Sequence, residues 1–128
     1  MRKDLTVILD DHAGQLAQMG QALGDAGVNV EGISATTHDG IGVVHLLVEN
    51  PMVAQNALIL AGLKVEGEDE AIVIDLREED IDRPGTLGRI ASKVSNQGVN
   101  IRAAYLATKG RAVLVTNDND RARAALDA

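Results

Sequence analysis

The feature that most constrains the fold is a six-residue motif that occurs twice. Residues 82–87 read Asp-Arg-Pro-Gly-Thr-Leu and precede Gly-Val-Asn-Ile at 98–101, and residues 11–16 read Asp-His-Ala-Gly-Gln-Leu and precede Gly-Val-Asn-Val at 27–30. The position numbers differ by 71 for the two motif glycines, for the two motif leucines and for the first glycines of the later segments. Equal offsets across motif and spacer indicate two copies of one structural unit.

Each motif predicts the start of an amphipathic helix. Pro84 fits the first turn of a helix because it has no N–H to leave unpaired. Leu87, Ile90 and Val94 follow at helical spacing, and Gly98 can adopt the left-handed conformation that ends a helix. The corresponding apolar positions of the first copy are Leu16, Met19 and Leu23.

The pattern of apolar and turn-forming residues before and after the first motif predicts the order βαββαβ for the first copy. The expected strands are 5–9, 28–37, 41–48 and 63–65. Asn50 and Pro51 predict a helix start, with asparagine as the cap and proline at the first position. Residues 66–70 read Glu-Gly-Glu-Asp-Glu and are expected to form an acidic connector between the copies.

The second copy is expected to lack its last strand. Its expected strands are 71–76, 99–108 and 111–116, and its last helix is 121–128. Ile72 follows Leu5 by 67 positions whereas the motifs are 71 apart, so residues 77–81 form a longer loop before the second motif. We therefore expect an α+β fold of two ferredoxin-like units, residues 1–67 and 68–128, with antiparallel sheets and helices on one face.

These residues resemble the ACT domain, an amino-acid-sensing module attached to many enzymes of amino-acid metabolism. The resemblance covers nearly the whole chain as a tandem pair. It is stronger in the second copy, because Ala13 stands where the family usually has proline. It implies a free amino acid bound at the interface between paired units and a separate protein as the target. Two very small units with one-sided sheets also favour a homodimer.

Composition excludes several classes of function. The net charge of −7 opposes binding to a nucleic-acid backbone, and the single aromatic residue leaves no stacking platform for bases. The chain has no cysteine, which excludes disulfides and thiolate chemistry and fits a reducing, cytoplasmic environment. No apolar run approaches membrane-spanning length, and no nucleophile–base pair or phosphate-binding loop is present. We therefore expect a protein that is not an enzyme and uses no cofactor.

The motif loops are the candidate site for a free amino acid, whose carboxylate and ammonium groups need donors and acceptors side by side. The backbone amides of Gly85, Thr86 and Leu87 could hold the carboxylate at the positive end of the helix dipole. Asp82 and the side-chain oxygen of Asn100 could accept ammonium protons. The candidate ligand-binding residues are Asp82, Gly85, Thr86, Leu87, Asn100 and Ile101 in the second copy, and Asp11, Gly14, Gln15, Leu16, Asn29 and Val30 in the first.

Each of these features has a purely structural alternative. Asp82 can be a helix cap and Gly85 a turn glycine. Asn100 is poor strand material, and a local hydrogen bond that fixes the turn into the strand explains it almost as well. Tyr105 is expected to pack at a sheet junction rather than to touch a ligand.

Two acidic segments of the chain are not expected to bind metal ions. Residues 10–12 read Asp-Asp-His but lack further ligands at metal-site spacing, so we expect a surface loop there. Residues 117–120 read Asn-Asp-Asn-Asp without the glycine and glutamate of a calcium loop, so we expect a capping cluster. The alternative to an amino-acid sensor is an interaction module or regulatory subunit of the same fold that binds no metabolite.

Overall fold

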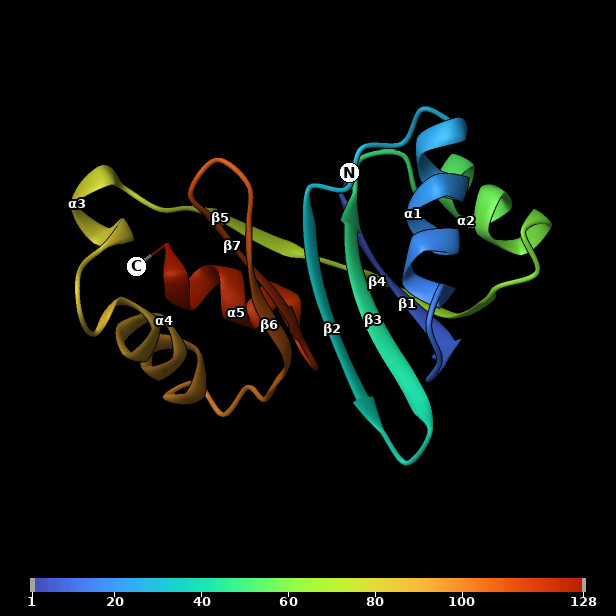
Figure 1. Cartoon of the computed structure of the whole chain (residues 1–128). Coiled ribbons are helices and arrows are strands. Elements are labelled where there is room, and N and C mark those ends of the chain that lie inside the picture. Colours follow the sequence, from blue (N-terminus) through green and yellow to red (C-terminus); the bar gives the residue numbers. More distant parts are fainter. Residues whose placement is uncertain (1, 128) are drawn as a thin grey trace. The chain divides into compact units, whose positions relative to one another are not determined.

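The computed structural model describes residues 2–127 and divides into two compact units, Met1–Glu70 and Ala71–Ala128 (Figure 1). The first unit has the predicted order βαββαβ. Its elements are β1 (Lys3–Asp10), α1 (Gln15–Asp25), β2 (Gly32–His38), β3 (Ile41–Val48), α2 (Pro51–Leu60) and β4 (Lys64–Glu70). The strands pair antiparallel in the order β4-β1-β3-β2, and both helices lie on one face of this sheet (Figure 1).

The second unit has a smaller sheet. Its elements are β5 (Ile72–Asp75), α3 (Glu78–Ile81), α4 (Thr86–Ser95), β6 (Ile101–Ala107), β7 (Arg111–Thr116) and α5 (Asn119–Leu126). The strands pair antiparallel in the order β6-β7-β5, and α4 and α5 pack against each other. In the described part of the chain no strand follows α5, as predicted. The edge strand β5 has only four residues, which keeps the unpaired edge short.

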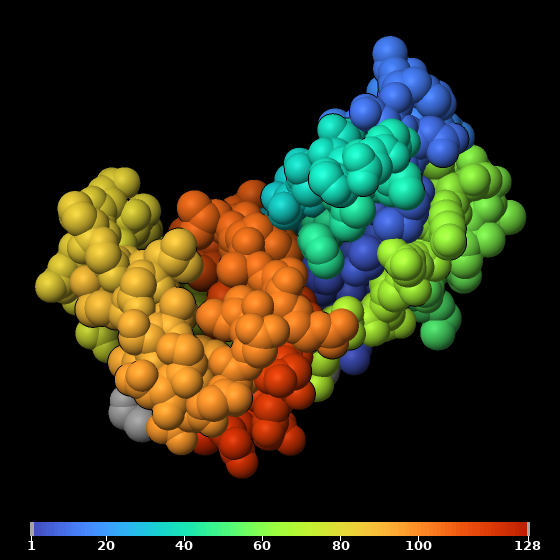
Figure 2. Space-filling model, turned by 90° about the horizontal axis from the view of Figure 1, so that it is seen from below, coloured from blue at the N-terminus to red at the C-terminus, as the bar shows by residue number. Residues whose placement is uncertain are grey.

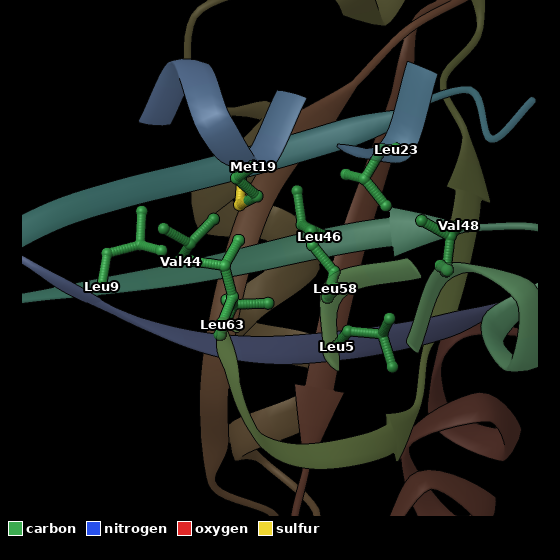
Figure 3. Close-up of a cluster of buried hydrophobic side chains, with 11 residues drawn as sticks. Leu5, Leu9, Met19, Leu23, Val44, Leu46, Val48, Leu58 and Leu63 are labelled. Carbon is green, nitrogen blue, oxygen red and sulfur yellow. The ribbon is translucent and has the colours of Figure 1, made fainter. Parts of the chain in front are cut away.

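The core of the first unit forms where α1 and α2 cover β1 and β3. Met19 and Leu23 from α1 and Leu58 from α2 point towards Leu5 and Leu46 on the sheet (Figure 3). The helix face of β1 is apolar at every second residue, as its sequence pattern predicts. The core of the second unit has fewer buried apolar side chains, in keeping with its missing strand. Its central cluster consists of Ile72, Val94, Val99, Leu114 and Ala122.

Two predictions about the connecting segments were wrong. Residues 66–70 belong to β4 rather than to a connector, because their backbone pairs with β1 as far as Lys3 opposite Glu70. An edge strand tolerates the exposed Glu66 and Glu68, whose charges also discourage pairing with other chains. Residues 77–81 contain the short helix α3 instead of an irregular loop, with three acidic residues in its first turn, where the helix dipole favours them.

The strands after the helices also begin later than expected. The chain leaves α1 through a C-terminal cap in which the Gly27 N–H donates to the Gly24 carbonyl at 3.0 Å and the Val28 N–H to the Leu23 carbonyl at 2.9 Å. Since this cap uses the backbone of Val28, β2 begins only at Gly32. In the second unit β6 begins at Ile101, two residues after the predicted start.

The left-handed cap of α1 gives the first testable prediction. Gly27 has a φ of 73°, and a Cβ added there would meet no atom within 4 Å, so Gly27→Ala costs only backbone strain. We expect the free energy of unfolding to fall by about 1–2 kcal/mol, measured by urea denaturation. The matched control is Gly20→Ala within the same helix, where we expect a gain of about 0.5–1 kcal/mol. Two changes of the same sign would contradict this explanation.

Candidate functional site

The two motif loops have the same backbone geometry. Gly14 and Gly85 are the N-cap residues of α1 and α4, with φ of 94° and 92°. In each loop, the residue after the glycine donates its N–H to the carbonyl two residues before the glycine, at 3.5 Å in the first loop and 3.4 Å in the second. The repeat seen in the sequence therefore extends to the conformation of the loop.

The position of Pro84 differs from the prediction. We expected it in the first turn of the helix, but α4 begins at Thr86. The left-handed conformation of Gly85 interrupts the helical backbone between them, so Pro84 lies just before the cap. A Cβ on residue 85 would also come within 3.2 Å of Arg89 Nη1, so the guanidinium group of Arg89 lies close to the loop backbone.

A cavity of about 340 Å³ lies within the second unit, between the motif loop, α4 and the sheet. It is lined by Leu76, Asp80, Ile81, Arg83, Gly85, Thr86, Leu87, Ile90, Ala104, Tyr105, Leu106, Ala112, Val113 and Leu114. In Figure 2 the yellow surface of the motif loop and α4 adjoins the orange surface of β6. The volume is near the lower end of the range of roughly 300–1,000 Å³ for ligand sites, so the cavity suits a small metabolite.

The sheet side of the cavity is open because α4 does not cover it completely. Ala104 and Leu106 lie opposite Leu114 and Ala112 in the register of β6 and β7, so all four side chains are on the face that carries the helices. Leu106 nevertheless keeps 73% of its surface exposed. The two alanines are small, which leaves space where larger residues would fill the gap between sheet and helix.

A cluster of charged groups lies at the loop side of the cavity. Asp80 Oδ1 is 3.6 Å from Arg89 Nη2 and 3.9 Å from Arg83 Nη1. Thr86 Oγ1 donates to the Asp80 carbonyl at 2.9 Å and accepts from Arg89 Nη2 at 2.8 Å. The side chains are partly exposed, so each ion pair contributes little stability. Two guanidinium groups face one carboxylate in this cluster, so an arginine such as Arg83 can also pair with the carboxylate of a ligand.

The first turn of α4 adds donors to the same side. The first four N–H groups of a helix have no acceptor within it. The Arg89 N–H makes the first intrahelical hydrogen bond, to the Gly85 carbonyl at 3.0 Å, and the Thr86 N–H is used by the Arg83 carbonyl. This leaves the N–H groups of Leu87 and Gly88 without intrahelical acceptors, at the positive end of the helix dipole.

The sequence model of the ACT domain family matches residues 3–67, just over half of the chain. The chain belongs to the ACT domain family. The match lies in the first copy, whereas the motif residues had led us to expect the closer resemblance in the second. No curated protein matches the chain significantly.

Solved structures share the fold of this ACT protein over nearly its whole length. Protein BT0572 from Bacteroides thetaiotaomicron has a TM-score of 0.81 at 22% identity, with 98% of this chain and 85% of that chain covered. The ligand-free regulatory subunit of aspartate kinase from Thermus thermophilus has a TM-score of 0.72 at 20% identity, with 98% and 88% covered. At these identities the similarity concerns the fold.

The structure brings together three of the candidate residues of the second ACT copy. Gly85, Thr86 and Leu87 line the cavity, but Asp82 is the exposed C-cap of α3 and does not. The Asn100 N–H donates to Asn117 Oδ1 at 3.0 Å, and the Asn100 carbonyl accepts from the Asn117 N–H at 3.1 Å. These bonds join the start of β6 to the end of β7. Ile101 packs half-buried against the core.

The candidate residues of the first ACT copy are spread over its surface and core. Asp11 is exposed, and its N–H donates to the Gly40 carbonyl at 3.2 Å. Gln15 Oε1 accepts from the Asp10 N–H at 3.2 Å, so this side chain fastens the loop to β1. Val30 packs against the core. Gly14, Leu16 and Asn29 are exposed.

Sequence reasoning missed Asp80 and Arg83, which both line the cavity. Asp80 was expected in the longer loop before the second motif, and only the fold of α3 brings it to the cavity. Arg83 lies inside the second motif, directly after Asp82, and this position is the signal that could have found it. At the capping cluster, Asp118 Oδ1 accepts from the Arg121 N–H at 3.1 Å and begins α5, as predicted.

Within residues 2–127 no group of three or more histidine, cysteine, aspartate or glutamate side chains is placed to hold a metal ion. No helix in the same range is both long enough and apolar enough to cross a bilayer.

Proposed function

We propose that this ACT protein is a regulatory protein that binds a free amino acid in the cavity of its second unit and acts on a separate protein. The observation that carries the proposal is the cavity itself, which has apolar walls and a loop side with donors and an acceptor. Arg83 and the Leu87 N–H can bind the carboxylate of the ligand. Asp80 meets the two guanidinium groups through Oδ1, and its Oδ2 can accept an ammonium proton.

Binding becomes a signal if the ligand favours one arrangement of the protein over another. The cavity is formed by three separate parts of the second unit, so a ligand that touches all three holds them together. Membership of the ACT family and the shared fold with a regulatory subunit of aspartate kinase support a regulatory role with a separate target. The placement of a ligand between two units, and the homodimer, remain predictions from the sequence.

Isothermal titration calorimetry of the full chain against the twenty amino acids tests this function. We expect saturable binding of at least one amino acid with one site per chain. Arg83→Gln should weaken that binding by about tenfold or more, because a hydrogen bond to a charged group contributes roughly 1.5–3 kcal/mol. The control is Arg121→Gln, which removes a similar exposed arginine with a carboxylate partner outside the cavity. Failure of all twenty amino acids to bind would refute the proposal.

The exposed face of α2 favours a second candidate function, an interaction module that binds no metabolite. Met52, Ile59 and Leu60 on this helix are 72%, 57% and 89% exposed, and the helix has no charged residue. Apolar helix faces of this kind often mark protein contacts. Affinity purification of this protein from the cell that makes it should then recover one enzyme in stoichiometric amount, whether or not amino acids are added. Leu60→Lys should abolish that recovery, and an unchanged yield would argue against this role.

A further inference from the structure

We infer that the cavity of the second unit selects amino acids with an aliphatic side chain, of the size of valine, isoleucine, leucine or methionine, over polar ones. The inference rests on the proposed function and adds the class of ligand to it. It follows from the distribution of polar and apolar groups around the cavity.

The polar side chains all lie on one side. The segment before α4 contributes Asp80 and Arg83, and the first residue of α4 contributes Thr86. The zwitterionic head group shared by all amino acids can pair with this side only. The side chain of the ligand must then extend towards the part of the cavity formed by the sheet and by α4.

That remaining part is aliphatic. Its walls come from Leu76, Ile90 and Leu106, and its sheet surface from Ala104 and Ala112. Tyr105 also lines the cavity, but it alternates with Ala104 and Leu106 along β6, so strand geometry directs its ring to the opposite face of the sheet. A ligand hydroxyl or carboxylate placed against these aliphatic walls would lose part of its water without gaining a polar partner, which disfavours serine, aspartate and glutamate.

The space next to the alanines sets the size. Their small side chains leave room that a branched or extended aliphatic group can occupy. Each methylene removed from water strengthens binding by about fourfold. Leucine has three more carbon atoms than alanine, so we expect it to bind at least about tenfold more tightly.

Titration calorimetry of the full chain with leucine, alanine, serine and glutamate tests the inference. We expect leucine to bind at least about tenfold more tightly than the other three. Ala104→Leu fills the cavity from an exposed strand position, so the fold should persist, which circular dichroism and thermal melting verify. This variant should weaken leucine binding at least about tenfold and change alanine binding by less than about threefold. Ala124→Leu, at an exposed position of α5 outside the cavity, should change neither.

The outcomes separate this inference from the proposed function. Tightest binding of serine or glutamate would overturn the aliphatic preference while leaving an amino-acid-binding protein. Equal effects of Ala104→Leu and Ala124→Leu on leucine affinity would overturn the inference by placing the ligand elsewhere. If none of the twenty amino acids binds, both the aliphatic preference and the proposed function are overturned.

Discussion

Replacing Leu58 with alanine is expected to lower the free energy of unfolding by about 3 kcal/mol. Leu58 is fully buried between α2 and the sheet, close to Leu46 (Figure 3). Removal of its side chain loses the transfer free energy of three carbon atoms and leaves a cavity that the surrounding structure fills only in part. Urea denaturation followed by circular dichroism measures the change.

The matched control is Leu60→Ala on the same helix. Leu60 is 89% exposed, so its truncation should change the free energy of unfolding by less than about 0.5 kcal/mol. Both substitutions exchange the same two residue types, so their difference isolates burial from helix propensity. Equal losses for the two variants would show that α2 does not pack on the sheet through Leu58.

Leu87→Asp is expected to abolish ligand-induced stabilisation. For the unaltered protein, an amino acid at 100 times its dissociation constant should raise the free energy of unfolding by about 2.7 kcal/mol. Leu87 lines the cavity from the first turn of α4 and is 67% exposed. An aspartate there is compatible with the positive end of the helix dipole, so the ligand-free protein should keep its stability. Its charge would repel the ligand carboxylate and remove part of an apolar wall.

The duplicated motif supplies the control for this variant. Leu16 occupies the equivalent position of α1 in the first unit and is 52% exposed. Leu16→Asp should therefore have a similar effect on the ligand-free protein and leave the stabilisation by the amino acid intact. Thermal denaturation of both variants with and without ligand measures the effect. Loss of stabilisation in Leu16→Asp but not in Leu87→Asp would place the binding site in the first copy.

The architecture of both units could be predicted because it depends on local patterns. The fixed offset between Gly14 and Gly85 revealed the repeat, and both glycines have nearly the same φ. Asn50 caps α2 as expected, with its Oδ1 accepting from the Val53 N–H at 3.3 Å. These features depend on the conformational preferences of single residues or on hydrogen bonds between near neighbours, which a sequence displays directly.

The missed features depend on tertiary contacts. The segment that contains Glu66 and Glu68 was predicted to be a connector, because nothing in its local sequence reveals that its backbone pairs with β1. The cavity escaped notice for the same reason. It joins Asp80 and Leu87 to Ala104, and the distances between such positions are set by how helix and sheet pack.

The most direct test of the binding site is a titration of the isotope-labelled chain with the tightest-binding amino acid, followed by two-dimensional nuclear magnetic resonance of the backbone amides. We predict that the signals of Leu87, Gly88 and Ala104 shift most and saturate at the dissociation constant found by calorimetry. Shifts concentrated at Gly14, Gln15 and Leu16 instead would contradict the assignment of the ligand to the cavity of the second unit.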